Sequence, residues 1–432
     1  MFISRSSLWS NLDCVDAEKT RVYLERSGTS PINVRLRRGR SPYSLDTFLQ
    51  IIPQAIGRLR SLSVSTEPGD LQDIISHLFH PAPLLETLHL DEYHREPQHY
   101  PVLESTILNG DLSSLRRLHL HCIHTELPWR NMVNLASFTL NSISACNFGQ
   151  LLDFFESAPH LHNIDLLYIT LISSGENGRL VSLDHLERME IIDCGPTSVL
   201  LDHLVIPVGA ELISQLDSIT FIIEDHIPRS LDNLKNLSSV AKIRLHLDGS
   251  EPLFMRFSGP DGQLCITNTY IYIPLSQALE SLARFDTSKT KRLRIDSSSD
   301  PLSRDVPYRA LLPMKNLHTL VLSRSTSLLC AFMDVLNPNT SPSKEVVCPS
   351  LQELIFVRRP RRGFGRGGEE EFHMQAVIEM AAVRASRGAK LGTIKNRAKL
   401  DPVDVLELRK HVLHVEYGPE VDLYEDGGDD NN

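Results

Sequence analysis

The amino-acid sequence predicts an α/β fold that extends by repeating one short unit. The chain has 432 residues, more than one hydrophobic core usually holds, so repetition is the first property to look for. An apolar pattern, L-x-x-L-x-L, recurs between residues 59 and 356. Segments with helical periodicity lie between several of its copies. Together these observations predict a leucine-rich-repeat solenoid, a horseshoe with a parallel concave sheet and a mostly helical convex side.

The apolar pattern is strict in some copies and looser in others, where related apolar residues or a threonine take the anchor positions. The strict copies are Leu85-Leu88-Leu90, Leu115-Leu118-Leu120 and Leu317-Leu320-Leu322. The looser copies are Leu59-Leu62-Val64, Leu135-Phe138-Leu140, Leu161-Ile164-Leu166, Leu186-Met189-Ile191, Leu216-Ile219-Phe221, Val240-Ile243-Leu245, Thr290-Leu293-Ile295 and Leu351-Leu354-Phe356. The second and third anchors alternate along a short strand, so they share one side of it. Stacked parallel strands would bury a continuous core; the alternative is a two-layer protein whose leucines repeat by chance.

The segments between the strands are expected to return along the convex side, mostly as helices. Residues 71–79 and 148–155 carry apolar residues at helical spacing, and Pro81 and Pro159 follow them as helix-ending signals. The interval from Val240 to Thr290 is longer than the others, and its Gly-Pro-Asp-Gly turn predicts a β-hairpin insertion near 250–275.

The repeats define the predicted domain organisation. We expect an N-terminal cap at 1–40, repeats at 41–368, a C-terminal cap at 369–418 and a disordered acidic tail at 419–432. Within the C-terminal cap, residues 369–387 are predicted to be helical.

Composition restricts the functional classes. The net charge of −10 argues against the whole chain acting as a basic surface for nucleic acid. The seven cysteines show no C-x-x-C pair, which favours reduced thiols and a cytoplasmic or nuclear location. No apolar run is long enough for a signal peptide or a membrane span, and the usual hydrolase, zinc-protease and dinucleotide patterns are missing. We therefore expect a chain that is not an enzyme, needs no cofactor and does not bind membranes.

Segments near both ends of the chain carry a more specific signal. They are Leu8-Trp9-Ser-Asn-Leu12-Asp13, Tyr23-Leu24-Glu25-Arg26-Ser27 and Pro31-Ile-Asn-Val34 at one end, and Leu408-Arg409-Lys410-His411-Val412 and Val415-Glu416-Tyr417 at the other. The first set resembles the stretch that follows the F-box in F-box leucine-rich-repeat proteins of mushroom-forming fungi, and the second resembles their closing strand. The resemblance implies the substrate-recognition part of an SCF ubiquitin ligase. In that group an F-box precedes the Leu-Trp segment, whereas this chain begins at Met1.

The resemblance leaves two forms of the function open. A Skp-type adaptor and a cullin are implied partners only if an F-box lies upstream of Met1. Without one, the chain is expected to be a stand-alone interaction scaffold that binds its targets but does not recruit the ligase.

The predicted binding surface consists of the residues that flank the second and third anchors, because these project from the concave face. The candidate partner-binding residues are Arg117, His119, His121, Arg188, Glu190, Lys242, Arg244, His246, Arg292 and Arg294. From Arg188 onward we predict a basic stripe that meets an acidic segment of a protein partner. The alternative is a solvated charged face without a specific partner.

Other positions of this surface are predicted separately. His89, His119 and His121 are expected to lie together without a metal, because no carboxylate or cysteine at the right spacing completes a ligand set. Ile355 and Val357 are expected to be exposed or covered by the C-terminal segment.

Two features lie outside the anchors and their flanking residues. Cys194 occupies the repeat position at which Asn or Cys commonly bonds the turn, so a structural role is expected. The Arg/Gly segment at 358–368 is either a solvated loop or a flexible segment for RNA binding or nuclear import.

Overall fold

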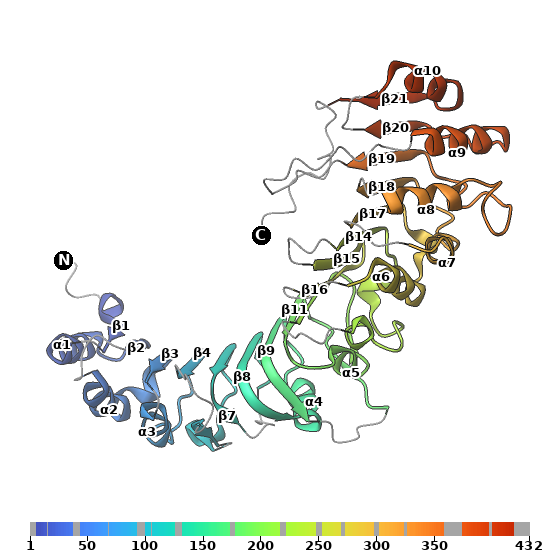
Figure 1. The fold of residues 1–432 in the computed structure, drawn as a ribbon. Helices are drawn as coiled ribbons and strands as arrows, with labels where there is room; N and C mark the ends of the chain where they lie inside the picture. The colour runs from blue at the N-terminus through green and yellow to red at the C-terminus, as the bar shows by residue number, and fades with distance from the viewer. Residues whose placement is uncertain are drawn as a thin grey trace. The chain divides into compact units, whose positions relative to one another are not determined.

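The structure, a computed structural model, confirms the α/β class. It describes residues 6–14, 16–37, 44–67, 69–92, 100–104, 106–125, 132–172, 178–216, 222–247, 253–268, 273–297, 302–323, 326–357, 374–396 and 400–418. The chain forms two compact units, Met1–Leu216 and Asp217–Asn432. Figure 1 labels the helices and strands of both. Each unit contains a mostly parallel sheet that is not closed into a barrel.

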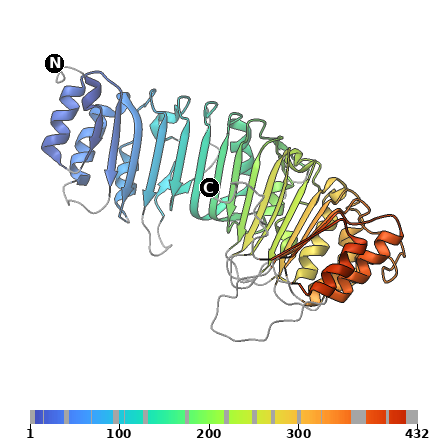
Figure 2. The same cartoon turned by 90° about the horizontal axis from the view of Figure 1, so that it is seen from above.

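In the first unit the strands of the main sheet lie side by side in chain order and run parallel (Figure 2). They are β1 (Asn11–Asp13), β2 (Ile32–Arg37), β3 (Leu59–Thr66), β4 (Thr87–Glu92), β6 (Arg117–His121), β8 (Ser137–Asn147), β9 (Asn163–Ile172), β11 (Arg188–Ile192) and β13 (Glu211–Leu216). Two small parallel sheets join neighbouring return segments. They pair β5 (Val102–Leu103) with β7 (His124–Thr125), and β10 (Val181–Ser182) with β12 (Leu204–Val205).

The helices of the first unit lie on one face of the main sheet. They are α1 (Ala17–Ser27), α2 (Ser44–Ala55), α3 (Asp70–Ser76), α4 (Phe148–Ser157) and α5 (Thr197–Leu201), with 3-10 turns η1 (Ser6–Trp9), η2 (Ile56–Arg58) and η3 (Ile107–Gly110). Helix α1 contacts β1, α2 contacts β2, α3 contacts β3 and β4, and α4 contacts β8. The helix predicted at 148–155 is confirmed as α4, and the helix predicted at 71–79 is observed as α3, which ends at Ser76.

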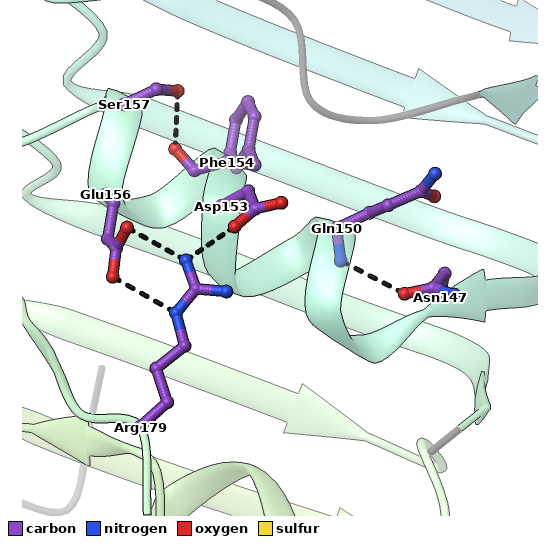
Figure 3. Close-up of polar contacts among 7 residues, drawn as sticks. All are labelled: Asn147, Gln150, Asp153, Phe154, Glu156, Ser157 and Arg179. Carbon is purple, nitrogen blue, oxygen red and sulfur yellow. Dashed lines mark hydrogen bonds and ion pairs between the residues drawn. The ribbon is translucent and has the colours of Figure 1, made fainter. Parts of the chain in front are cut away.

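Helix α4 shows how the sequence fixes a return segment. The Asn147 side chain accepts a hydrogen bond from the Gln150 backbone N–H and so caps the helix start. Across the next segment, Arg179 contacts the carboxylates of Asp153 and Glu156 at 2.5 and 2.8 Å (Figure 3). The apolar side of the helix is buried, with the Phe154 ring packed against Phe138 of β8 at 4.3 Å between centroids.

The repeat anchors form the core because they align across the strands. Leu62 pairs in register with Leu88, Leu88 with Leu118, and Leu118 with Phe138. All four are at most 1% exposed. Burial of each such side chain contributes about 1.5–3 kcal/mol to folding. Because all four are buried together only when the strands are parallel and in register, their burial favours this arrangement.

In the second unit the sheet mixes a parallel series with a hairpin. The parallel series is β14 (Lys242–Leu247), β17 (Arg292–Ser297), β18 (Thr319–Ser323), β19 (Glu353–Val357), β20 (Thr393–Asn396) and β21 (His414–Tyr417). The helices are α6 (Leu275–Ser281), α7 (Asp305–Leu311), α8 (Thr326–Leu336), α9 (Met374–Ser386) and α10 (Pro402–His411), with η4 (Ile223–Asp225), η5 (Lys235–Leu237), η6 (Leu282–Arg284) and η7 (Thr287–Lys289). Successive helices from α6 to α10 contact one another along one side of the sheet.

The hairpin predicted near 250–275 is confirmed and belongs to the sheet itself. Strand β15 (Leu253–Gly259) pairs antiparallel with both β14 and β16 (Gly262–Asn268), so it continues the sheet beyond β14. Gly259 is required at the turn, since a Cβ there would lie 1.9 Å from the Ser239 carbonyl oxygen.

The structure corrects two sequence predictions, and two others lie partly or wholly outside the described residues. The strand expected at Leu216-Ile219-Phe221 is instead β13, at 211–216, and residues 217–221 lie outside the described residues. Residues 408–411, expected in the closing strand, end helix α10, and only 414–417 form that strand, β21. The helix predicted at 369–387 is observed as α9, from 374 to 386. The acidic tail at 419–432 lies outside the described residues.

Candidate protein-binding face

The two faces of each sheet differ in what covers them. Alternate residues point toward the helices and are buried, whereas the residues between them lie on the opposite face. We call this opposite face the open face, because no helix among the described residues packs on it. In β3 the buried side chains are Leu62 and Val64, and the open face carries Ser61, Ser63 and Ser65.

On the open face of the first unit, β3, β4 and β6 bring together a group that we call the histidine cluster. Its members are Ser65, His89, Asp91, His119 and His121. The rings of His89 and His119 stack in parallel, 4.1 Å apart between centroids. His121 Nδ1 lies 2.5 Å from one carboxylate oxygen of Asp91, and Ser65 donates to the other at 3.0 Å. The predicted neighbourhood of the three histidines is therefore confirmed.

The environment moves the pKa values of these imidazoles in opposite directions. The hydrogen bond to Asp91 raises the pKa of His121 to about 9. Burial, followed by the neighbouring His89, lowers the pKa of His119 to about 4. Burial also lowers the pKa of His89. At neutral pH the cluster thus presents one imidazolium, paired with a carboxylate, next to two neutral rings.

The side chains of the histidine cluster contact one another. Within the described ranges, no group of three or more His, Cys, Asp or Glu side chains is arranged to hold a metal ion. The stacking of His89 on His119 and the pairing of His121 with Asp91 direct these side chains toward each other.

On the open face of the second unit, β15, β14 and β17 carry a group that we call the arginine cluster. Its members are Lys242, Arg244, Arg256, Arg292, Arg294 and Asp296. Lys242 is opposite Arg292 in the strand register, and Arg244 lies between Arg294 on one side and Arg256 on the other. The cations of β14 and β17, which the sequence places in the predicted basic stripe, are therefore neighbours across these two strands.

Asp296 organises the arginine cluster. Its side chain is 7% exposed, and its carboxylate accepts a hydrogen bond from Arg294 Nε at 2.8 Å. Arg244 Nε and His246 Nδ1 lie 3.9 and 3.8 Å from the same oxygen. Burial would raise the pKa of Asp296, but the adjacent His246 and Arg294 outweigh it and hold the pKa below its usual range. The buried carboxylate is thus ionised and anchors the cations around it.

An aromatic side chain completes this arrangement. The Phe254 ring of β15 stacks with His246 at 5.0 Å, and the guanidinium groups of Arg244 and Arg256 lie 4.9 and 5.8 Å from its centroid. Phe254 and Arg256 were not among the predicted site residues. The sequence shows that these two residues alternate along the predicted hairpin. It does not show that β15 pairs with β14, and this pairing places them beside Arg244.

The remaining predicted residues lie in the first unit. Arg117 donates from Nε to Thr87 at 3.1 Å on the neighbouring strand. Arg188 contacts Glu190 at 3.1 Å and Glu211 at 3.6 Å. In the predicted basic stripe, Arg188 is therefore paired with two carboxylates. The other cations of that stripe are members of the arginine cluster in the second unit.

The open face continues over the last strands with a mixed character. Lys395 of β20 contacts Glu353 of β19 at 2.9 Å, and Thr319 of β18 donates to the same carboxylate at 3.1 Å. Ile355, predicted to be exposed or covered, is 5% exposed, and Val357 is partly exposed. The Arg/Gly segment at 358–368 lies outside the described residues, so its role stays a prediction.

The expected structural role of Cys194 is confirmed. Its thiol lies 3.2 Å from the carbonyl oxygens of both Leu166 and Ile192, and the side chain is 1% exposed. Burial raises the pKa of this thiol to about 12, so it remains protonated and serves as a donor to the turn.

Comparison with known proteins gives no assignment. No protein-family model matches the chain, and no curated protein matches it significantly. In the described part of the chain, no helix has both the length and the apolar character needed to span a membrane. The function is therefore inferred from the chain's own residues.

Proposed function

We propose that this chain is a leucine-rich-repeat solenoid that binds a partner protein on its open face. The supporting observation is the unequal covering of the sheets, since helices pack on one face while aligned polar side chains occupy the other. Parallel strands in chain order, joined by returns on one side, are typical of that fold. Neighbouring strands are about 4.8 Å apart, so the open face presents many side chains at regular spacing over an extended area. Such a surface suits contact with another protein.

We further propose that the partner is a target for ubiquitination. Support comes from the resemblance of the segments that form η1, β1, α1 and β2 to the stretch following an F-box. In a form of the protein that carries an F-box, a Skp-type adaptor and a cullin are expected to co-purify with it. In a form without one, the open face is expected to bind the same target as a stand-alone scaffold.

The proposal is tested by blocking the open face without changing the core. Ser61 and Ser137 lie on this face of β3 and β8 and are partly exposed. The double variant Ser61→Arg and Ser137→Arg places long side chains there. The matched control is Ser76→Arg with Ser386→Arg, two exposed serines on the helices α3 and α9.

Both variants and the unmodified chain are used as bait in cells, and captured proteins are quantified by mass spectrometry. We expect a specific partner to be retained by the helix-side control and reduced at least about tenfold with the open-face variant. Equal retention by both variants, with unchanged thermal unfolding, contradicts binding on the open face.

A further inference from the structure

We propose that strand β21 and helix α10 of the second unit form an interface between two copies of this chain. In this interface β21 pairs antiparallel with the β21 of a second copy, so that the two sheets continue into one another. The inference concerns self-association and does not depend on which partner the open face binds.

The first support is that the core is left partly uncovered at β21. Ile394 of β20 is completely buried, whereas Val415, its partner in the register of β21, is partly exposed. Tyr417 pairs with the buried Asn396 but is 42% exposed, and Leu413, just before the strand, is 63% exposed. Exposed apolar side chains gathered in this way mark an interaction surface.

At β1, the strand that opens the sheet of the first unit, the anchors are covered instead. Leu12 of β1 and Cys14 directly after it are 2% and 0% exposed, and α1 contacts both β1 and η1. The β1 side thus offers no exposed anchors that could meet those of β21 in a head-to-tail chain of copies. The surface at β21 fits a closed two-fold pairing with itself.

The second support is the backbone of β21. In the part of the chain that the structure describes, β21 pairs with β20 alone. The N–H groups of His414 and Gly418 donate to carbonyl groups in or next to β20. In a parallel pair the N–H and C=O groups of the alternate residues, Val415 and Tyr417, therefore point to the other edge. Such an edge accepts another strand unless Lys, Pro or a bulge blocks it, and β21 contains neither Lys nor Pro.

The third support is that the sequence around β21 is complementary to its own reverse. When Val415 lies opposite the Val415 of a second copy, Leu413 lies opposite Tyr417 on the helix-facing side of the sheet. On the open face, His414 lies opposite Glu416. Apolar or aromatic side chains thus meet each other and an imidazole meets a carboxylate, which are pairs that stabilise an antiparallel sheet. In the same register the outward N–H and C=O groups of the two Val415 residues face each other.

Helix α10 takes part in the same interface. The helices α8, α9 and α10 contact their neighbours in turn, so continuing the sheet places α10 of the second copy beside α10 in the opposite direction. Val403 and Leu406 of α10 are 71% and 64% exposed, and they can pack between the two helices. The antiparallel arrangement also brings the acidic first turn, with Asp404, toward the basic last turn of the other copy, with Arg409 and Lys410.

The pairing determines how the open faces of the two second units are presented. Residues that lie opposite each other in an antiparallel pair point to the same side of the sheet. The two open faces next to the interface therefore lie on one side of the joined sheet. A partner protein with two binding segments can then be held by both copies, which raises its affinity through effective concentration.

The test measures the mass of the full chain by sedimentation equilibrium. We expect the mass to rise from that of one chain toward that of two between about 1 and about 100 µM, since a small interface usually has an affinity in the micromolar range. Over the same range the amide hydrogens of Val415 and Tyr417 should exchange more slowly, because pairing places them in hydrogen bonds. The mass of one chain at every concentration overturns the proposal.

Two double variants test the register. Leu413→Lys with Tyr417→Lys places like charges opposite each other, whereas Leu413→Lys with Tyr417→Glu places opposite charges at the same positions. We expect the dissociation constant to rise at least about tenfold for the first variant and less than about threefold for the second. The matched control is Ile222→Lys with Leu312→Lys, two residues of the second unit that are 49% and 45% exposed, and its association should not change.

The second double variant also separates loss of pairing from misfolding, because it changes the same two residues. Equal loss of association in both double variants contradicts the pairing of β21 with itself. Association that neither variant weakens, or that the control weakens as much as the first variant does, assigns the interface to another surface.

The chain's own segment 419–432 is a competing occupant of the β21 edge. It is tested in a full-length variant with Val421→Asn and Leu423→Asn, which removes apolar side chains from that segment. If only this variant forms dimers, the segment occupies the edge and self-association of the unmodified chain is refuted. Equal association of the variant and the unmodified chain supports the pairing of two copies.

Discussion

At the scale of single residues, the pair of His121 and Asp91 couples stability to pH. The pKa of His121 is raised to about 9 in the folded chain from the ordinary value of 6.5, so the folded state favours its protonated form. The resulting stabilisation is complete below about pH 6.5 and is lost as the pH rises through 9. The pKa of Asp91 is lowered, because hydrogen bonds from His121 and Ser65 outweigh the effect of burial. Its contribution is present above about pH 4 and is lost on acidification below that.

We therefore predict that His121→Gln destabilises the chain in a pH-dependent way. The pair is partly exposed, which reduces its contribution to about 1 kcal/mol at pH 6, and the loss should largely disappear at pH 9.5. The free energy of unfolding in urea, measured at both pH values, checks this. The exposed His318→Gln serves as the control. An equal loss at both pH values rules out the charged pair as the cause.

A second residue-scale prediction concerns Arg384 of α9, whose side chain is completely buried. Its amino groups donate to the carbonyl oxygens of Val347 and Cys348 at 2.7 and 2.9 Å, and Cys348 has a left-handed backbone with φ 49°. Burial lowers the pKa of this guanidinium. We expect Arg384→Met to lower the free energy of unfolding by about 2 kcal/mol, because two buried carbonyl groups lose their donors. Chemical denaturation measures the change, and an unaltered midpoint would refute the role of Arg384 in holding the loop.

At the scale of secondary-structure elements, the side-chain cap of Asn147 determines where α4 begins. Asn147→Ala is expected to cost about 1 kcal/mol, whereas Asn147→Asp should keep the cap and cost much less. The contacts that Arg179 makes with this helix should contribute less than about 1 kcal/mol and weaken with salt, because Arg179 is partly exposed and its carboxylate partners are exposed. Thermal unfolding of the two Asn147 variants tests the cap, which is rejected if they behave alike.

The close approach of the β15–β16 hairpin to Ser239 can also be tested. Gly259→Ala must displace β15 from the Ser239 carbonyl oxygen, and we expect a loss of about 2 kcal/mol in the free energy of unfolding. Gly57→Ala is the control, since an added Cβ there meets no neighbouring atom. Similar stability of the two variants contradicts the close approach at Gly259.

At the scale of the whole molecule, the repeat pattern predicted most of the parallel strands of the two main sheets, because apolar anchors report directly on burial. The strand near 211–216 was misplaced since Ser214, which is 1% exposed, takes the position of an apolar anchor. Strand β20 was not predicted for the same reason, as the buried Asn396 pairs with Phe356. A polar residue at an anchor position interrupts the apolar pattern, so the strand that contains it is not predicted from that pattern.

The candidate site was predictable only where it follows the strand register. The stacking of His89 on His119 and of Arg244 beside Arg294 follows from the anchor spacing. The contribution of β15 does not, because a hairpin inserted between two repeats can fold away from the sheet as readily as join it. The contact of Arg188 with Glu211 could not be predicted either, because Glu211 lies on β13, the strand whose position was wrongly predicted.

A site-specific cross-linking map in cells tests directly whether the open face is the partner-binding surface. A photoreactive amino acid is placed singly at Ser63 or Lys242 on the open face, and at the exposed residues Asp73 of α3 or Glu379 of α9 on the helical side. We expect covalent adducts with one partner protein from the open-face positions and little or none from the helical positions. Adducts that form mainly from Asp73 and Glu379, or equally from both sides, would contradict this expectation.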